Sequence, residues 1–533
     1  MTLLGGEEIQ AGVRDWLLSG RPFGVGPGAV REIVTHGSRV FLGPGRVLKM
    51  KRAVRYPYLD FSTLEKRRAA TEAEVALNRR TAPELYRGLV VVYVGTDGLT
   101  LDAADAGGEP VECLVDMARF PDGALLSDIA EADPNRLDRH LMEDLGDAVS
   151  VLHARAEVVT DPALGGAEGI RATLQGNAAS FRAQPAGVFV AEKVDRLAGR
   201  LATELERHAA LLDDRRSRGE IRLGHGDLHL ANIFLDEAGQ PVPFDCIDFD
   251  RRIASVDRVY DLAFLLMDLH HRGLGLAATC LFNRYFDRMD TDLGRDAGGL
   301  AALPLWLATR AAIRAHVTAQ AALGSTKGDP LDPRIPAARA LLDRALAFLE
   351  PAPPRLLAVG GLSGSGKSRV ARHLAPALGA APGARLVRTD VVRKRLYNCD
   401  LMARLGPEGY TAEATRRTFA QVEREIRAAL AAGHSVVADA VFLRPEQRDR
   451  VETLARDMGV PFQGLWVETS LAIRTERALA RIRNVSDATR EVVEMQEEVD
   501  PGPVSWTRID STGTRENTLG LARKSLTWAS TRT

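Results

Sequence analysis

Two short stretches of the chain concentrate side chains that handle phosphates and protons. The first, LGHGDLHLANIF at 223–234, places Asp227 and Asn232 five residues apart among two histidines, a density of polar groups that a packed core disfavours. The second, VGGLSGSGKSRV at 359–370, combines closely spaced glycines with serines and a lysine. Glycine-rich turns, a lysine, a carboxylate and an amide are the groups that position nucleotide phosphates, Mg²⁺ and an acceptor hydroxyl. Both stretches therefore predict phosphate chemistry.

The second stretch fits the phosphate-binding pattern G-x-x-x-x-G-K-[ST], with an apolar run before it and a helical run after it. In this pattern backbone N–H groups curl around a β-phosphate, the lysine reaches the β- and γ-phosphates, and the last hydroxyl binds Mg²⁺. The predicted nucleotide-binding residues are Gly361, Ser363, Gly364, Ser365, Gly366, Lys367 and Ser368, and Ser368 is also a predicted Mg²⁺ ligand.

Further polar residues follow this pattern at the ends of apolar runs. SVVADA ends in Asp439, where a carboxylate supports Mg²⁺ through water, and RLVRTD ends in Asp390, which is placed to engage an acceptor hydroxyl. The alternative for Asp390 is a helix N-cap. Arg477 and Arg481 share a helical face and either close over the phosphates or form a solvated basic surface.

The first stretch has the D-x-x-x-x-N spacing of a kinase catalytic loop. Asp227 is the predicted acceptor of the hydroxyl proton, and Asn232 offers its amide oxygen to Mg²⁺. A second metal-binding aspartate should follow on the next hairpin, where PFDCIDFD supplies three. We predict Asp248, which precedes Phe249, as the metal ligand, with Asp245 and Asp250 as alternatives.

A kinase site also needs a lysine for the nucleotide phosphates and a glutamate that pairs with it. RVLKMK offers Lys49 and Lys51 on one strand face, and Lys49 is favoured because two apolar residues precede it. Glu74 is its predicted partner, with Glu72 as the alternative, and Met117 is predicted to face the adenine. No G-x-G-x-x-G pattern precedes the lysine.

The elements that must position these residues fall into two domains. SRVFLGPGRVLKMKR predicts a hairpin, EKRRAATEAEVALNRR a helix, and DPNRLDRHLMEDLGDAVSVLHARA a helix with Asp133 as its N-cap and Pro134 in its first turn. Prolines near residue 352 mark a boundary, after which strands and helices alternate. We predict a two-lobed, protein-kinase-like α+β fold at 1–350 (small lobe about 1–118, helical lobe about 119–350) and an α/β P-loop kinase with a parallel sheet at 354–533.

Composition adds broad limits. The chain has 533 residues, 45% of them hydrophobic and 26% charged, and its net charge is −1, which gives no signal for nucleic acid or an anionic membrane. The four cysteines form no CxxC pair, and the first ten residues resemble no signal peptide, so a cytoplasmic protein with reduced thiols is expected. Oligomeric state is left open.

Each half resembles a known family. HGDLHLAN, IDFD and DRVYDLAFLL resemble aminoglycoside phosphotransferase-like kinases, a resemblance that gives Asp261 a structural role. GLSGSGKS, RTDVVRKRL and VVADAVF resemble small P-loop kinases of the gluconate kinase, chloramphenicol phosphotransferase and zeta-toxin type. The whole chain looks like bifunctional fusions of an aminoglycoside phosphotransferase-like domain with an ATP-binding domain.

These resemblances imply a tandem phosphotransferase that uses ATP and Mg²⁺ to phosphorylate hydroxyls of small molecules. Three alternatives stay open at this point. One domain could be the enzyme while the other binds nucleotide to regulate it. The protein could be an ATP-gated interaction module, or its second domain could act as a toxin on nucleotide sugars.

Overall fold

The computed structural model describes residues 6–527, except residues 36, 57–58, 96–97, 103–107, 249, 290–296, 326–331, 481–484 and 488. The chain groups into two compact units. The first comprises residues 1–170 and 213–265, and the second comprises residues 171–212 and 266–533. The joint predicted near residue 352 therefore lies inside the second unit, between a long helix and the first strand of the P-loop region.

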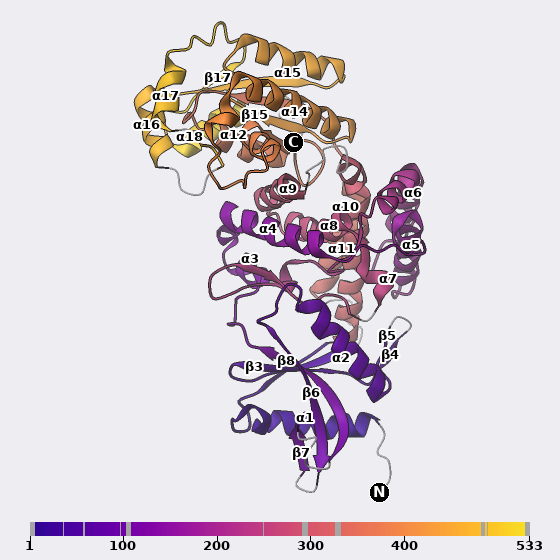
Figure 1. Cartoon of the computed structure of the whole chain (residues 1–533). Coiled ribbons are helices and arrows are strands. Elements are labelled where there is room, and N and C mark those ends of the chain that lie inside the picture. Colours follow the sequence, from indigo (N-terminus) through magenta and orange to yellow (C-terminus); the bar gives the residue numbers. More distant parts are fainter. Residues whose placement is uncertain are drawn as a thin grey trace. The chain divides into compact units, whose positions relative to one another are not determined.

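The first unit contains an antiparallel sheet with the strand order β1-β2-β3-β8-β6-β7 (Figure 1). Its strands are β1 (Arg31–Val34), β2 (Ser38–Leu42), β3 (Arg46–Lys51), β6 (Tyr86–Gly95), β7 (Gly98–Leu101) and β8 (Glu109–Ala118). The predicted hairpin is confirmed, because β2 pairs with β3 across a three-residue turn at 43–45. The predicted helix after it is α2 (Leu64–Asn78), capped by Thr63.

Alternation along β3 decides which helix each of its side chains faces. Leu48 and Met50 pack in one apolar cluster with Val13 and Leu17 of α1 (Gly6–Leu18). Val47 packs in the opposite cluster, which includes α2. Because successive strand side chains point to opposite faces, the lysines at 49 and 51 share the face that carries α2.

The remaining elements of the first unit are short strands and helices that carry the catalytic-loop sequence. They are β4 (Arg55–Tyr56), β5 (Leu59–Asp60), α3 (Leu126–Ala132), α4 (Arg139–Arg155), β9 (Ile221–Leu223), β10 (Ile233–Leu235), β11 (Pro241–Pro243), α7 (Arg251–Ala254) and β12 (Ser255–Asp257). Strand β9 pairs with β12, and β10 pairs with β11. Helices α5 (Gly166–Arg182), α6 (Ala191–Ser217) and α8 (Arg258–His271) each have residues in both units.

One predicted helix start is wrong. Asp133 caps only a 3₁₀ turn at Pro134–Arg136, and α4 begins later, with Asp138 as its N-cap accepting from the Leu141 N–H at 3.0 Å. Leu137 interrupts the run with a non-helical backbone and is itself buried. Two capping aspartates five residues apart thus each begin a separate local structure, where the pattern predicted one continuous helix.

The second unit contains a parallel sheet with the order β14-β15-β13-β16-β17, as the alternation of strands and helices predicted. Its strands are β13 (Leu356–Gly360), β14 (Arg385–Arg388), β15 (Val436–Asp439), β16 (Phe462–Glu468) and β17 (Thr507–Asp510). Every residue of β13, β14 and β15 is buried, as expected for strands covered on both faces.

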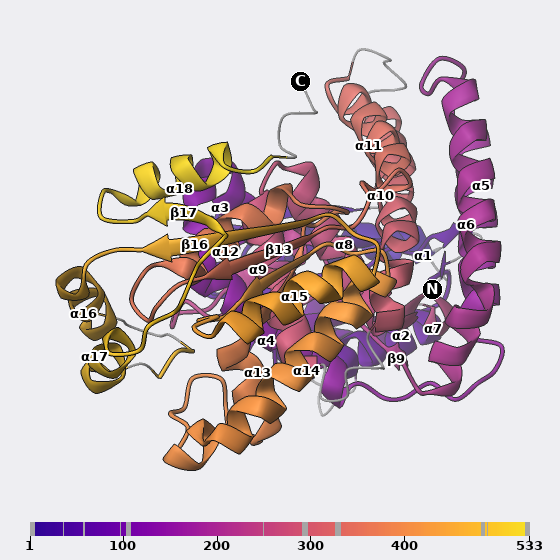
Figure 2. The same ribbon diagram turned by 90° about the horizontal axis from the view of Figure 1, so that it is seen from above.

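Helices cover both faces of this sheet, with α12 and α18 on one side and α14 and α15 on the other (Figure 2). They are α12 (Lys367–Leu374), α13 (Thr389–Leu396), α14 (Ala412–Ala431), α15 (Pro445–Asp457), α16 (Leu471–Leu479), α17 (Arg490–Glu497) and α18 (Arg515–Lys524). The unit also includes α9 (Gly275–Met289), α10 (Ala297–Ser325) and α11 (Arg334–Phe348). Within the described ranges, no helix combines the length and apolar character needed to cross a lipid bilayer.

Candidate nucleotide sites

The first unit encloses a cavity of about 230 Å³ between its sheet and the segment after β11. Apolar side chains of the sheet and of the segment that follows β8 line it, including Val40, Val47, Met117, Phe120 and Phe244. Its charged lining residues are Lys49, Asp245, Arg31, Arg119, Asp122 and Asp128. An apolar slot with a few convergent charges is the usual form of a small-molecule site, and Met117 lies where the sequence placed the adenine contact.

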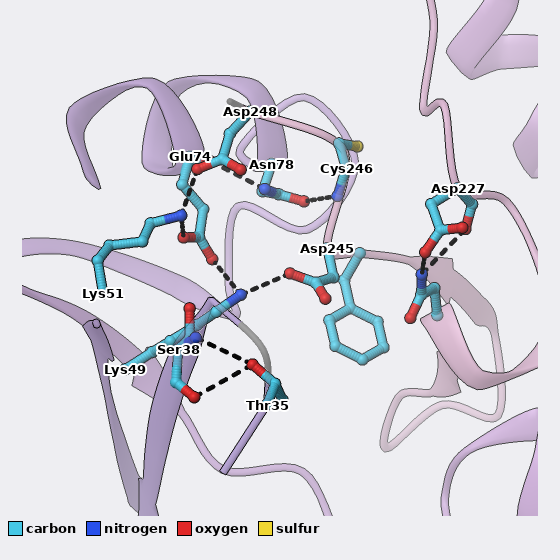
Figure 3. Close-up of polar contacts among 12 residues, drawn as sticks. Thr35, Ser38, Lys49, Lys51, Glu74, Asn78, Asp227, Asp245, Cys246 and Asp248 are labelled. Atoms are coloured by element: carbon cyan, nitrogen blue, oxygen red, sulfur yellow. Dashed lines mark hydrogen bonds and ion pairs between the residues drawn. The ribbon is translucent and has the colours of Figure 1, made fainter. Parts of the chain in front are cut away.

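The predicted lysine and glutamate come together at this cavity. Lys49 Nζ lies 2.8 Å from Glu74 Oε1 and 2.6 Å from Asp245 Oδ1 (Figure 3). Burial alone would lower the pKa of Lys49, but the carboxylates of Asp245 and Glu74 outweigh it and raise that pKa well above its ordinary value. Glu72, the alternative partner, instead pairs with Arg68 on the exposed side of α2.

The structure separates the three candidate aspartates of PFDCIDFD. Asp245 faces Lys49 and the cavity, whereas the Asp248 carboxylate is 8% exposed and paired with Lys51. Burial raises the pKa of Asp248, even though Lys51 favours its charged form. Asp250 caps α7, accepting from the Arg252 N–H at 2.8 Å. The geometry therefore favours Asp245 over the predicted Asp248 as the carboxylate available to a metal.

A strained backbone presents Asp245 to the cavity. Its φ is +61°, in the left-handed region that a residue with a β-carbon rarely adopts. Three contacts hold the segment: Asp245 N–H donates to Tyr86 Oη at 3.3 Å, Cys246 N–H to Asn78 Oδ1 at 2.8 Å, and Ile247 N–H to the His225 carbonyl at 2.9 Å. Such over-determined strain is common at functional sites.

Asp227 and Asn232, the predicted catalytic-loop residues, are hydrogen-bonded to each other. Asn232 Nδ2 donates to Asp227 Oδ2 at 3.0 Å and to the Asp227 carbonyl at 2.9 Å (Figure 3). This orientation turns the Asn232 amide oxygen, the end that binds metal ions, away from Asp227. The Asp227 side chain is 40% exposed, so an acceptor hydroxyl can reach it.

Beneath this loop, the buried carboxylate of Asp261 accepts the backbone N–H groups of His225 at 2.6 Å and Gly226 at 3.0 Å. The contacts fit the structural role that the resemblance implied for Asp261.

In the second unit the glycines of the P-loop are required by close approach. A β-carbon on Gly361 would lie 2.2 Å from the Val467 carbonyl oxygen, and one on Gly364 would lie 2.3 Å from the Arg474 carbonyl oxygen. Gly366, with φ +96°, immediately precedes α12, which starts at Lys367 and continues through Ser368. Ser363 and Ser365 are buried in the loop. The loop therefore forms a narrow backbone cradle at a helix N-terminus, the arrangement that binds phosphate.

Asp439 lies beside this cradle. It ends β15 and is paired in register with Val359, two residues before the P-loop. Its carboxylate is 4% exposed; Oδ2 lies 3.4 Å from Arg388 Nε, and Oδ1 has no hydrogen-bond partner among the described residues. A buried carboxylate oxygen without a donor needs a cation or an ordered water, so Asp439 and the Ser368 hydroxyl fit a Mg²⁺ site.

The donor sets fit Mg²⁺ in both units. No cluster of three His, Cys, Asp or Glu side chains that could hold a metal occurs in the described part of the chain. Mg²⁺ in kinases takes one or two protein oxygens and completes its shell with nucleotide phosphates and water. Asn232 with Asp245, and Ser368 with Asp439, are sets of this small size.

Three predicted residues of the second unit remain: Asp390, Arg477 and Arg481. Asp390 lies in the first turn of α13, whose N-cap is Arg388, so Asp390 is not the N-cap that the alternative proposed. Arg477 donates to the Ser511 carbonyl at 2.8 Å, and Ser511 Oγ donates to the Ser365 carbonyl of the P-loop at 2.7 Å. Arg481 lies outside the described residues.

Sequence reasoning did not identify Gln496 of α17, whose Oε1 accepts the Ser363 N–H of the P-loop at 2.8 Å. Asp487 was also missed; it joins Lys394 of α13 at 3.0 Å and accepts from Tyr410 Oη at 2.7 Å. Gln496 stands in no recognisable motif, whereas Asp487 belongs to an SDA stretch that resembles the small P-loop kinases and to which no role was assigned.

Comparison with known proteins finds two separate matching regions in the chain. Residues 67–306 match the model of a phosphotransferase enzyme family, and residues 356–501 match the model of an AAA domain. The first matched region contains the catalytic-loop sequence, and the second contains the P-loop.

Similar proteins match most of the chain or a part of it. An uncharacterized protein of Mycobacterium tuberculosis is 28% identical over 507 residues, which cover 92% of this chain and 94% of the relative. A choline/ethanolamine kinase family protein from Mesorhizobium loti is 15% identical and covers 64% of this chain and 99% of its own, with a TM-score of 0.36. A gluconokinase from Sinorhizobium meliloti 1021 is 21% identical and covers 32% of this chain and 89% of its own, with a TM-score of 0.24.

Proposed function

We propose that the protein is a tandem ATP-dependent phosphotransferase, in which each domain transfers the γ-phosphate of ATP to a hydroxyl of a small molecule. The observation that carries the proposal is that Lys49 pairs with both Glu74 and Asp245 and, together with Asp245, lines one cavity. The phosphotransferase-family and P-loop domains support kinase-type phosphoryl transfer in general. The second site, the hydroxyl acceptor and the use of ATP in both units are our extension.

In the first site, Lys49 positions the nucleotide phosphates while Glu74 orients the lysine. The oxygen of the acceptor hydroxyl bonds to the γ-phosphorus while Asp227 accepts the hydroxyl proton. The bond between the γ-phosphorus and the β-phosphate oxygen breaks, and ADP is released. Asn232 and Asp245 would hold Mg²⁺. When bound there, the ion would supply positive charge that offsets the negative charge developing during transfer.

In the second site, the backbone N–H groups of the P-loop and Lys367 position the phosphates, and Ser368 with Asp439 would hold the metal. Asp390 would engage the acceptor hydroxyl. Arg477, whose Nη1 lies 3.9 Å from the position that a β-carbon on Gly366 would take, would contact phosphate. Catalysis in both sites would come from positioning and charge neutralisation, and neither site needs a covalent enzyme intermediate.

The test uses γ-labelled ATP and a bacterial extract separated into metabolite, RNA and protein fractions. Purified wild type is compared with Asp227→Ala and Lys367→Ala, each of which should lower labelling at its own site by about 10²-fold or more. Asp250→Asn is the matched control, because Asp250 caps α7 on the same segment and should leave labelling unchanged. Two active kinases would give two labelled products, each lost in a different variant.

A second candidate, one active domain regulated by nucleotide at the other, is supported by a specific contact. Asp287 of α9, in the helical region before residue 350, pairs with Arg385 of the P-loop sheet at 2.6 Å. Under this alternative Asp227→Ala and Lys367→Ala would change the same product, one by abolishing it and the other by altering its nucleotide dependence. If neither variant changes labelling, the catalytic proposal fails for both domains.

A further inference from the structure

The first site contains a second buried lysine that the proposed reaction does not use. Lys51 Nζ lies 2.7 Å from Glu74 Oε2, on the opposite oxygen from the one that Lys49 contacts, and it also pairs with Asp248. Five charged side chains thus alternate in sign in the order Asp245, Lys49, Glu74, Lys51, Asp248 (Figure 3). One end of this row faces the nucleotide cavity and the other end is buried.

The alternation of charges matters because Lys49 and Asp245 bind phosphate and metal during the proposed reaction. Lys49 must turn toward phosphate and Asp245 toward the metal, which weakens their contacts within the row. Glu74 is 1% exposed, and a buried carboxylate that loses its only cation is strongly destabilised. With Lys51 on its second oxygen, Glu74 keeps a counter-charge when Lys49 engages the nucleotide.

Lys51 also anchors the segment that presents Asp245. Its partner Asp248 lies three residues after Asp245, and the Cys246 N–H between them is fixed by Asn78 of α2. The strained conformation of Asp245 is therefore held between two anchored points. Without the Lys51 contact, the Asp248 carboxylate would be buried and unpaired. The free-energy cost of that buried charge would favour a shift of the segment toward solvent.

The position of Lys51 is itself built into the sheet. Its side chain is 4% exposed, its Nζ lies 5.2 Å from the centre of the Phe61 ring, and its carbonyl accepts from Gln10 Nε2 of α1 at 2.8 Å. A lysine that merely covered a surface would extend to solvent. Here the ammonium group is held inside the unit between two carboxylates.

We propose that Lys51 is a positioning residue of the first nucleotide site, which holds Glu74 and the Asp245 segment in place while Lys49 binds the phosphates. This inference rests on the proposed function of the first domain. It predicts that Lys51 affects recognition of phosphate and metal and leaves recognition of the nucleoside unchanged, because Lys51 is not among the residues that line the cavity with Met117.

The test measures calorimetric affinity for ATP with Mg²⁺ and, separately, for adenosine. All variants carry Lys367→Ala, so that binding at the P-loop does not contribute. Lys51→Met should weaken ATP binding by about 10-fold or more and change adenosine binding by less than about twofold. Lys51→Arg, which keeps the charge, should recover most of the ATP affinity. If Lys51→Met does not fold, Asp248→Asn should weaken ATP binding several-fold with adenosine unchanged.

Two results would overturn the role of Lys51. One is wild-type affinity for both ligands in Lys51→Met, and the other is an equal loss for both, which indicates general damage to the unit. Lys49→Met separates this failure from failure of the proposed site. If Lys49→Met also binds ATP like wild type, the nucleotide site itself has been placed wrongly.

Discussion

The contact between α9 and β14 allows a prediction in which a buried and an exposed ion pair are compared within one interface. Arg385 Nη2 lies 2.6 Å from Asp287 Oδ1, and both side chains are less than 10% exposed. Arg385 also donates to Asn283 Oδ1 at 2.8 Å. Replacing Arg385 with Met leaves the Asp287 carboxylate buried without this cation. Breaking a buried pair in this way costs about 3–5 kcal/mol of folding free energy.

A neighbouring pair supplies the matched control. Arg288 and Asp400 lie 2.7 Å apart, but their side chains are 27% and 53% exposed. Exposed pairs contribute roughly 0–1 kcal/mol, so Arg288→Ala should change stability by no more than that. The double variant Arg385→Met with Asp287→Leu removes both buried charges and should recover most of the loss, because an apolar pair of similar volume avoids the desolvation cost.

Urea unfolding followed by tryptophan fluorescence measures these differences, since Trp306, Trp466 and Trp506 all lie in the second unit. The reasoning is refuted if Arg385→Met costs under about 1 kcal/mol, or if the double variant is no more stable than Arg385→Met. Either result would mean that Asp287 gains no net stability from its arginine.

Three further predictions follow from single contacts. Gly364→Ala should abolish the ATP-dependent rise in melting temperature of the second unit, because the alanine β-carbon would collide with a facing carbonyl. The control, Gly433→Ala, is also at positive φ but has open space around it, so that variant should keep the ATP-dependent rise. Burial lowers the pKa of His434 to about 4, so between pH 6.5 and 4 the unfolded chain binds a proton that the folded chain does not. The free energy of unfolding should therefore fall by about 3 kcal/mol as the pH drops through that range. His434→Asn should flatten this dependence of stability on pH. Asp261→Asn should lower phosphoryl transfer at the first site by about 10-fold or more and change ATP affinity by less than about threefold, since Asp261 supports the loop that carries Asp227 and does not line the nucleotide cavity.

Local patterns predicted the parts of the sites that depend on local structure. The P-loop is a contiguous strand, turn and helix, so its glycines and Lys367 could be assigned from spacing alone. The pairing of Lys49 with Glu74 could be predicted only in part. Strand alternation and helix periodicity set the face that each residue occupies, but they do not set the distance between the two side chains. The structure supplies that distance, 2.8 Å.

The choice between Asp245 and Asp248 could not be made from the sequence. It depends on the left-handed backbone at Asp245 and on donors and acceptors far away in the chain, such as Tyr86 Oη and the side-chain oxygen of Asn78. The motif I-D-F drew attention to Asp248, whereas the fold uses that aspartate to pair with Lys51. The packing of α9 against β14 could not be predicted from the sequence either, because α9 carries no motif.

The packing of α9 against β14 suggests a structural reason why two candidate phosphate-binding sites occur in one polypeptide. Strand β14 is an edge of the parallel sheet, and an edge strand presents unpaired backbone groups. The side chain of Asn283 in α9 covers them: Nδ2 donates to the Ala384 carbonyl at 3.1 Å, and Oδ1 accepts the Leu386 N–H at 2.6 Å. Strand β14 leads directly into α13, which carries Asp390. The helical region before residue 350 therefore completes the sheet on which the second candidate site is built, and a cut at the apparent domain joint would expose that edge.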